Sequence, residues 1–319
     1  MLNIGVFGAG HLGKIHLNIL NESKYYNLIG FYDPDFDNAK KVSDLYNCKS
    51  FNSPEELILR CDVIDIVTPT LFHHQIAIQA LSNKCHIFIE KPITKNLKEA
   101  REIIELANSN GLLGQVGHVE RFNPAFIASK ASITNPMFIE SHRLSEFNSR
   151  GTDVPVVLDL MIHDIDIILS LVKSPIVSIN ASGVKVISST PDIANARIEF
   201  KNGCVANLTA SRISMKKMRK SRFFQKDAYI SVDFLTKKSE IVKIKDLPVN
   251  SDKMALTLQN DNGEKKEIYF ENPKINESNA ILEELNSFAN SILNNKKPVV
   301  DLNDGFLALK TAQRIIDSY

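Results

Sequence analysis

The sequence predicts an α/β protein in two domains: a doubly wound parallel sheet in residues 1–118, and an α+β domain with a large, mostly antiparallel open sheet in residues 119–319. Apolar runs of strand length alternate with amphipathic helical segments from residue 2 to about residue 116, which is typical of a parallel sheet covered by helices. A glycine-rich turn joins the first run to the first helix. From about residue 176 to 270, short strands follow one another between turn signals, as in antiparallel sheets.

The first element is an apolar strand at residues 2–7, followed by a G-x-G-x-x-G turn formed by Gly8, Gly10 and Gly13. A helix begins directly after the turn. In this context the motif predicts a dinucleotide site: the first glycine permits the tight turn, the second lets a pyrophosphate approach, and the third lets the helix pack closely. The positive end of the helix then attracts phosphates. His11 and Leu12, between the last two glycines, are included among the expected cofactor-binding residues.

The second strand, at residues 28–32, ends in Asp33. An acid at this position accepts hydrogen bonds from the ribose hydroxyls of NAD and repels the 2′-phosphate of NADP. No arginine follows directly; Pro34 and Asp35 do. We therefore expect NAD rather than NADP as the cofactor.

The rest of the first domain keeps the alternation. We expect strands at residues 63–67, 86–89 and 112–116, and helices at residues 37–46, 74–82 and 96–110, with another helix starting at Ser53. Ligands of open α/β sheets lie at the carboxyl ends of the strands, where Thr68, Pro69, Glu90 and Lys91 stand. A lysine beside a nicotinamide can donate a hydrogen bond to an alcohol or carbonyl oxygen. The alternative is a surface lysine before a turn.

A polar cluster lies on the helix predicted at residues 155–172. Asp159, His163 and Asp166 stand at i, i+4 and i+7, so they share one stripe of an α-helix, next to an apolar stripe. Buried charge is costly unless it is paired or used, and histidine exchanges a proton near neutral pH, as alcohol oxidation requires. The alternative is a solvated polar face that carries a satisfied histidine.

The sequence also predicts the other elements of the second domain. We expect a helix from Arg121 to about residue 132, strands at residues 138–144, 177–188, 194–200, 205–211, 222–224 and 229–234, a hairpin turn at Asn262 and Gly263, and closing helices at about 277–293 and 302–318.

Together, G-x-G-x-x-G near residue 10, Glu-Lys-Pro near 90 and Asp-x-x-x-His near 160 resemble the glucose–fructose oxidoreductase/inositol dehydrogenase/rhizopine catabolism (Gfo/Idh/MocA) family. The resemblance implies an NAD(P)-dependent oxidoreductase with a Rossmann domain and a C-terminal domain whose open sheet forms dimers or tetramers. It implies that Lys91 is the active-site lysine, that His163 is the acid/base, and that Asp159 is the acid one turn before it. His74 matches the histidine on the nicotinamide side. Met161 is a departure, because many members have glycine there.

Residues 117–125 resemble the branch whose members act on UDP-N-acetylhexosamines and related nucleotide sugars. Arg121 and Asn123 are the expected substrate-binding donors of this stretch, together with Lys91, Asp159 and His163. The alternative is that Arg121 only pairs with a local acid such as Glu120. The basic run at residues 216–222 is typical of a solvated face; the alternatives are a further contact for a diphosphate and a subunit contact. We expect UDP-N-acetylglucosamine or a close relative to be oxidised, at position 3 of the hexose.

Composition restricts the class of partner. A net charge of +1 offers no global field for nucleic acid, and no run reaches membrane-span length. The first strand leaves no room for a signal peptide, so we expect a cytoplasmic protein, and the four cysteines have no metal-ligand spacing. The expected partners are a small-molecule sugar and a second copy of the chain, in a homodimer or homotetramer. Three alternatives stay open: an inositol or free-sugar dehydrogenase, an NAD-dependent glycoside hydrolase without net redox change, and a non-catalytic NAD-binding regulator.

Overall fold

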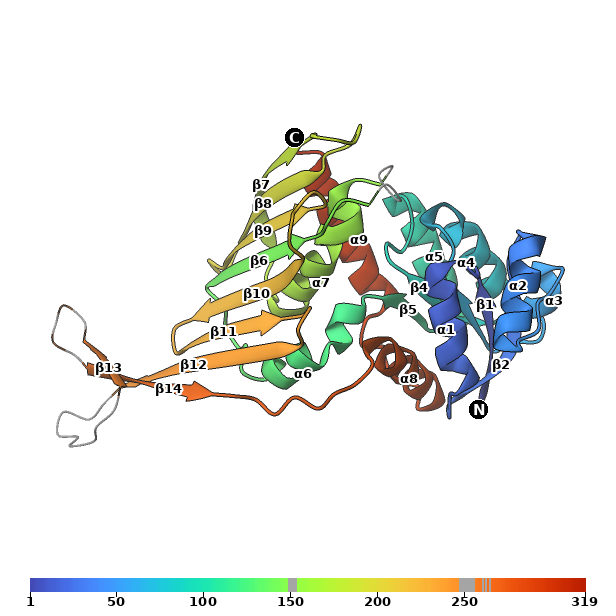
Figure 1. Ribbon diagram of the computed structural model, residues 1–319, viewed down its shortest axis with the longest axis horizontal. Coiled ribbons are helices and arrows are strands. Elements are labelled where there is room, and N and C mark those ends of the chain that lie inside the picture. Colours follow the sequence, from blue (N-terminus) through green and yellow to red (C-terminus); the bar gives the residue numbers. More distant parts are fainter. Residues whose placement is uncertain (149–153, 247–255, 260, 262, 264) are drawn as a thin grey trace. The chain divides into compact units, whose positions relative to one another are not determined.

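The computed structural model describes residues 1–148, 154–246, 256–259, 261, 263 and 265–319 (Figure 1). It contains two compact units, of which the first comprises Met1–Val119 and Asn279–Lys310 and the second Glu120–Ser278 and Thr311–Tyr319. The predicted fold class is confirmed, because one unit holds a parallel sheet and the other a large, mostly antiparallel one.

The sheet of the first unit is parallel throughout, in the order β2-β1-β3-β4-β5. Its strands are β1 (Leu2–Phe7), β2 (Tyr26–Tyr32), β3 (Val63–Ile66), β4 (His86–Glu90) and β5 (Gly114–Gly117). Beyond β2, Ser50 makes a single parallel bridge to Phe31. This segment takes the place of the outer strand in the six-stranded order 3-2-1-4-5-6 of doubly wound dinucleotide-binding folds.

Helices cover this sheet, and each either begins at a residue that caps it or packs an apolar face on the sheet. They are α1 (His11–Asn21), α2 (Phe36–Tyr46), α3 (Pro54–Ile58), α4 (His73–Ser82) and α5 (Leu97–Asn110). Asp35, Ser53 and Asn96 accept hydrogen bonds from the first turns of α2, α3 and α5, and Gly111 ends α5 in the left-handed conformation. The helix starts predicted at Ser53 and Asn96 are therefore observed.

Residues 279–310 pack with the first unit, whereas the sequence order suggested that they continue the second domain of 119–319. They hold α8 (Ala280–Leu293) and the first part of α9 (Leu302–Ile316). The Tyr26 hydroxyl donates to the carbonyl of Leu285, and the Gln115 side chain donates to that of Glu284. Phe288 lies in the core cluster beside Phe88. The apolar face of α8 thus completes a core that the first 119 residues leave open.

The second unit is built on a nine-stranded sheet in the order β13-β14-β12-β11-β10-β6-β9-β8-β7 (Figure 1). The strands are β6 (Phe138–Leu144), β7 (Ile176–Val184), β8 (Ile193–Phe200), β9 (Val205–Ser211), β10 (Met218–Gln225), β11 (Ala228–Asp233), β12 (Lys238–Asp246), β13 (Leu256–Gln259) and β14 (Lys265–Glu271). Among these neighbours β6 and β9 are parallel and the rest antiparallel. Asn262 of the predicted hairpin lies outside the described residues, although β13 and β14 pair on either side of it.

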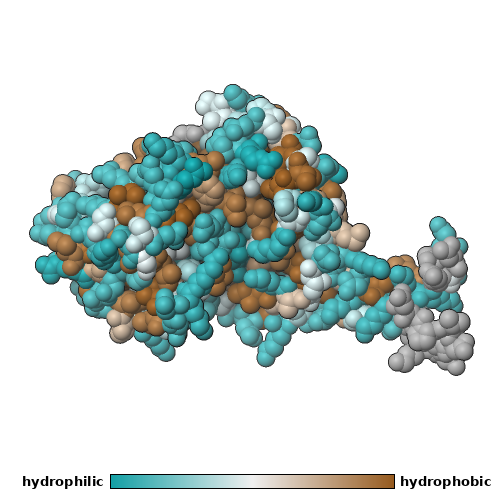
Figure 2. Space-filling view, turned by 180° about the vertical axis from the view of Figure 1, so that it is seen from behind, coloured by the Kyte–Doolittle hydropathy of each residue, from teal (hydrophilic) through white to brown (hydrophobic). Residues whose placement is uncertain are grey.

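One face of this sheet is apolar and covered, and the other is mixed. Helix α6 (Pro124–Lys130) packs on β11 and β12, and α7 (Ile162–Leu171) packs on β6. The strands alternate accordingly: Ala194, Ala196 and Ile198 of β8 are buried, while the Arg197 side chain between them is 45% exposed. Hydrophilic and hydrophobic side chains are interspersed on the molecular face that Figure 2 presents. Within the described parts of the chain, no helix is long and apolar enough to cross a membrane.

Candidate functional site

The carboxyl ends of the five parallel strands bring the predicted cofactor residues of the first unit to one edge. Gly8 follows β1, Asp33 follows β2, Thr68 comes two residues after β3, Lys91 follows β4 and His118 follows β5. The strand order reverses between β1 and β3, which is where open α/β sheets bind their ligands.

The three glycines of the turn differ in what a side chain at each position would contact. Gly8 has a φ of +97°, and a Cβ there would lie 2.8 Å from the carbonyl oxygen of Val67. A Cβ at Gly13 would overlap the carbonyl oxygen of Gly8. A Cβ at Gly10 would meet no protein atom within 4 Å. The fold itself therefore requires Gly8 and Gly13, whereas the space beside Gly10 is open to a ligand.

The first turn of α1 offers its backbone N–H groups to that space. Gly10 is the N-cap residue and is extended, and no side chain caps the helix. His11 is exposed, while Leu12 is half-buried and packs against the core. An uncapped helix start after a glycine turn suits phosphate.

Asp33 is joined directly to this turn. Its Oδ2 accepts a 2.7 Å hydrogen bond from the N–H of Ala9, and its Oδ1 accepts a 2.9 Å bond from the N–H of Asp35. The carboxylate is thereby held beside the glycine turn with lone pairs to spare. The space at Gly10, the uncapped helix and the fixed carboxylate fit a dinucleotide, with Gly10 and α1 for its pyrophosphate and Asp33 for a ribose.

The loop after β3 carries two adjacent histidines with different surroundings. His73 is buried, and its ring nitrogens lie 3.0 Å from the Pro92 carbonyl oxygen and 2.9 Å from that of Thr68. The Nε2 atom of His74, which the sequence suggested as the cofactor residue, lies 2.8 Å from Oε2 of Glu102 on α5. His73 thus ties together the loops that follow β3 and β4. The sequence prediction missed it, because only burial distinguishes the two rings.

Thr68 and Pro69 lie on the same edge as the glycine turn. The methyl carbon of Thr68 is 3.1 Å from the point where a Cβ of Gly8 would lie. Its Oγ1 is buried and has no hydrogen-bond partner among the described residues. Pro69 precedes a single turn of 3-10 helix, Thr70–Phe72. The threonine hydroxyl is therefore placed to serve a ligand of this edge.

Glu90 ends β4 and Lys91 follows it, and the Lys91–Pro92 peptide bond is cis. The N–H of Lys91 donates to Glu90 Oε2 over 3.2 Å. On its other side the Glu90 carboxylate approaches His16 of α1, which in turn contacts Asp65 of β3. His16 and Asp65 are further residues that the sequence prediction missed, because they lie 49 positions apart.

In the second unit, the helix predicted at residues 155–172 begins differently. Val157–Met161 forms a π-helix, with α7 following from Ile162. Hydrogen bonds from i to i+5 widen the turn that carries Asp159, directly before the α-helix that carries His163. Both are half-buried, and Met161 is fully buried in the core. π-turns are frequent at functional sites.

Asp166, which the sequence predicted to share one stripe with Asp159 and His163, is held in a buried ion pair. Its carboxylate is buried and accepts two hydrogen bonds from Arg121, of 2.6 Å from Nε and 2.7 Å from Nη2. Its neighbour Asp164 accepts two from Arg143, of 2.9 and 3.0 Å. Two acidic residues that follow His163 in α7, Asp164 and Asp166, are thus fixed by bidentate arginine pairs.

The donors expected to bind substrate are engaged within the second unit. The Nε and Nη2 atoms of Arg121 are used by Asp166, and the guanidinium is buried. Asn123 caps α6 by accepting from the N–H of Ala125, and its amide donates to Glu120 and to the carbonyl of Phe234. The alternative in which Arg121 pairs with an acid describes the structure, with Asp166 rather than Glu120 as that acid.

Glu120 has other partners, and the basic run is also largely paired. Arg143 contacts Glu120 at 2.8 Å, and Arg219 of the basic run lies 3.7 Å from the same carboxylate. Arg222 pairs with Glu140 at 2.9 Å.

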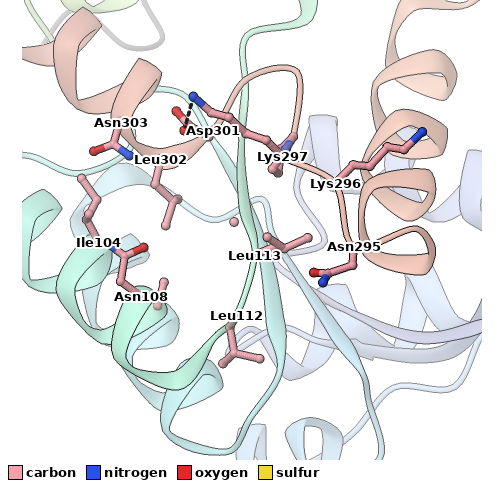
Figure 3. A pocket seen from close by; sticks show the side chains of 13 residues that line it. Ile104, Asn108, Leu112, Leu113, Asn295, Lys296, Lys297, Asp301, Leu302 and Asn303 are labelled. Atoms are coloured by element: carbon pink, nitrogen blue, oxygen red, sulfur yellow. Dashed lines mark ion pairs between the residues drawn. The ribbon is translucent and has the colours of Figure 1, made fainter.

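The pocket drawn in Figure 3 lies elsewhere on the first unit. Its volume is about 310 Å³, and it is lined by the second half of α5, by Leu112 and Leu113, and by the connection between α8 and α9. Leu112 and Leu113 precede β5, so the pocket is at the amino end of that strand, opposite the glycine turn. Lys297 at its rim pairs with Asp301 at 2.9 Å. This pocket is not the dinucleotide edge.

Comparison with known proteins gives a consistent result. Residues 2–118 match the model of an oxidoreductase family with an NAD-binding Rossmann fold, and residues 98–226 match the GFO/IDH/MocA C-terminal domain. A UDP-N-acetylglucosamine 3-dehydrogenase of Acidithiobacillus ferrooxidans is 37% identical over 235 residues, which are 73% of this chain and 74% of that protein. A solved structure of a UDP-N-acetylglucosamine 3-dehydrogenase from A. ferrooxidans covers 99% of this chain and 97% of its own, with a TM-score of 0.88 and 30% identity. The scyllo-inositol 2-dehydrogenase (NAD(+)) of Bacillus subtilis is 28% identical over 66% of this chain and 67% of its own length.

Proposed function

Because the chain belongs to the Gfo/Idh/MocA oxidoreductase family, we propose that it oxidises a secondary hydroxyl of UDP-N-acetylglucosamine or a close relative, at position 3 of the hexose, with NAD. The observation that carries the substrate assignment is the 37% identity over 235 residues to a dehydrogenase of that name. The corresponding identity to the inositol dehydrogenase is 28%. We assign cofactor binding to the first unit, and substrate binding and assembly to the second.

The proposed reaction uses three side chains. His163 takes the proton of the hydroxyl group as general base, and Asp159, which precedes it on the π-turn, orients the imidazole. Lys91 donates a hydrogen bond to the same oxygen and stabilises the negative charge that develops on it. NAD, when bound, supplies the acceptor for the hydride. His163 returns its proton to water after the ketone has formed.

Cofactor choice rests on Asp33. The carboxylate is fixed by the N–H groups of Ala9 and Asp35 at the glycine turn, so it cannot turn away from a 2′-phosphate without losing both hydrogen bonds. This supports NAD over NADP.

The experiment that tests the function is a substrate screen by NADH absorbance, with UDP-sugars, free sugars and inositols side by side. NADH formation should be fastest with UDP-N-acetylglucosamine or a close relative. Faster oxidation of inositol or glucose would contradict the nucleotide-sugar assignment. It would favour an inositol or free-sugar dehydrogenase, the alternative that the inositol dehydrogenase relative supports. Consumption of a glycoside without accumulation of NADH would indicate a hydrolase.

We also propose that the mixed face of the nine-stranded sheet pairs with a second copy of the chain. Phe138, Phe224 and Tyr229 form an aromatic cluster on it, with ring centroids 5.8 and 5.0 Å apart. Phe224 is 37% exposed. Light scattering at micromolar concentration should give a dimer or tetramer, and Phe224→Glu should lower the mass. A monomeric wild type would contradict this assembly.

A further inference from the structure

Three ionisable side chains meet inside the first unit, where the proposed reaction does not use them. His16 comes from α1, Asp65 from β3 and Glu90 from the end of β4. His16 Nδ1 lies 2.8 Å from Asp65 Oδ2, and His16 Nε2 lies 3.6 Å from Glu90 Oε1. The side chains of His16 and Asp65 are 0% exposed and that of Glu90 is 13% exposed. The ring of Phe88 packs edge-on against the imidazole.

Burying these three ionisable side chains would destabilise the fold unless their charges stabilise one another. An unpaired ionised group in an apolar interior is strongly destabilised, and two carboxylates near each other favour uptake of a proton. Burial by itself lowers the pKa of His16, but the charges of Asp65 and Glu90 and the hydrogen bond to Asp65 outweigh it, so the pKa is raised. An imidazolium between two carboxylates is the arrangement that this direction favours.

Glu90 depends on that imidazolium. The pKa of its carboxyl is raised, chiefly because burial favours the neutral acid, and the charges of His16 and Lys91 oppose that shift by favouring the carboxylate. Asp65 acts in the same direction as burial. The other ionisable group close to the cluster is Tyr26 of β2, whose pKa is raised by burial and by the charge of Asp65. Tyr26 donates to a backbone carbonyl and supplies no positive charge.

The cluster reaches Lys91 through Glu90. Glu90 Oε2 accepts the backbone N–H of Lys91, and the charge of Lys91 acts on the same carboxylate. The carboxylate lies directly on β5, because a Cβ on Gly117 would be 2.7 Å from Glu90 Oε1. A glycine at 117 therefore gives Glu90 its place. Helix α1 starts at the glycine turn and also carries His16, which approaches Glu90. One helix therefore links the cofactor-binding edge to the residue that precedes Lys91.

We propose that Asp65, His16 and Glu90 form a positioning unit for Lys91: Asp65 holds the His16 imidazolium, the imidazolium favours the carboxylate form of Glu90 beside Gly117, and the Glu90 carboxylate fixes the backbone of Lys91 and favours its ammonium form. This rests on the proposed function, in which Lys91 donates to the reacting oxygen. Asp65, His16 and Glu90 are positioning residues, since they act through Lys91.

The first test does not depend on activity. The reactivity of the Lys91 amine towards an amine-specific acylating reagent is followed from pH 7 to 11 by peptide mass spectrometry of the full-length protein. In Glu90→Gln, the labelling curve should move to lower pH. Labelling at fixed pH should be about tenfold faster, because loss of an adjacent opposite charge lowers the pKa of a lysine by about one or more. His16→Gln should shift the curve in the same direction, because Glu90 then becomes neutral more easily. Unchanged curves in both variants would overturn the proposal.

Glu99→Gln is the matched control. Glu99 lies on α5, its side chain is 14% exposed, much like that of Glu90, and it pairs at 3.0 Å with Lys95, which precedes that helix. It should leave Lys91 labelling unchanged. Glu90→Asp keeps the charge but shortens the side chain, so it should retain the wild-type pH dependence more closely than Glu90→Gln. A shift in the control as large as in Glu90→Gln would also overturn the proposal.

Kinetics with the best substrate of the screen form the second test. Glu90→Gln and His16→Gln should lower kcat by about 10- to 100-fold through a misplaced Lys91, while KM for NAD stays within about threefold. The alkaline limb of the kcat profile should move to lower pH. An active wild type with unchanged kcat in both variants would overturn this inference alone. A wild type that forms no NADH with any sugar would overturn the proposed function, and Lys91 labelling would still decide the positioning unit.

Discussion

The buried pair between Arg121 and Asp166 gives a sharp prediction of stability. The two side chains are 6% and 1% exposed and share two short hydrogen bonds. Hydrogen bonds to charged groups contribute about 1.5–3 kcal/mol each, so two give about 3–6 kcal/mol. This agrees with the roughly 3–5 kcal/mol lost when one partner of a buried ion pair is removed. Asp166→Ala should therefore lower the free energy of unfolding by about 3–5 kcal/mol, and Asp166→Asn, which keeps an acceptor, should fall at the lower end.

Urea denaturation followed by far-UV circular dichroism measures this loss, since the chain has no tryptophan for fluorescence. Glu199→Gln is the control, because Glu199 pairs with Arg197 at 3.1 Å but the two side chains are 45% and 40% exposed. That pair should contribute about 1 kcal/mol or less. A cost for Asp166→Asn no larger than that of the control would refute the view that this is a buried, desolvated charge pair.

The double variant Arg121→Met with Asp166→Leu separates the structural role of Arg121 from substrate binding. Replacing both charges with apolar side chains removes the buried unpaired group, so most of the lost stability should return. If Arg121 acts through the fold, KM for the nucleotide sugar should then lie within a few-fold of wild type. A KM raised more than about 100-fold in a stable double variant would show that Arg121 contacts the substrate directly, as the sequence suggested.

Four further variants test the site and one tests acid stability. Gly10→Ala should unfold in urea like wild type, because its Cβ meets no protein atom, yet lose NAD affinity by calorimetry. Asp33→Ser should reduce the preference for NAD over NADP in KM. His163→Ala and Lys91→Ala should each lower kcat by about 10² to 10⁴ with unchanged NAD affinity, since each loses a positioned proton-transfer or charge-stabilising group. Burial opposes a low pKa at Asp192, but hydrogen bonds from the N–H groups of residues 186–188 outweigh it and hold the pKa low. The stability that this carboxylate contributes is present above the unfolded pKa of about 3.9 and is lost as pH falls through the folded pKa. Asp192→Asn should therefore make the free energy of unfolding depend less on pH in acid.

Local patterns predicted the first unit well. The strand at Leu2–Phe7, the glycine turn and the helix starts at Ser53 and Asn96 each depend on neighbouring residues, so the sequence reveals them directly. The spacing of Asp159 and His163 could not reveal the π-turn, because a periodicity argument assumes the α-helix that it tests.

Contacts between distant residues were beyond such reasoning. Arg121 and Asp166 are 45 positions apart, and His16 and Asp65 are 49 apart. One sequence holds no signal that pairs them, and burial, which decides their roles, follows only from the assembled sheet. The return of residues 279–310 to the first unit is a similar case, since chain order alone places them after the second domain.

The discontinuity of the first unit has a consequence for synthesis on the ribosome. After residue 119 has emerged, α8 has not yet been made, so the core cluster in which α1, α2 and the sheet pack with Leu285 and Phe288 is still incomplete. At about 5–20 residues per second, the chain needs on the order of ten seconds or more to deliver α8. During that interval the nascent cofactor-binding part lacks this helix and exposes apolar surface, while the strands of the second unit are being made. Translation rate and chaperone access should therefore influence the yield of this protein through its amino-terminal part, even though that part is made first.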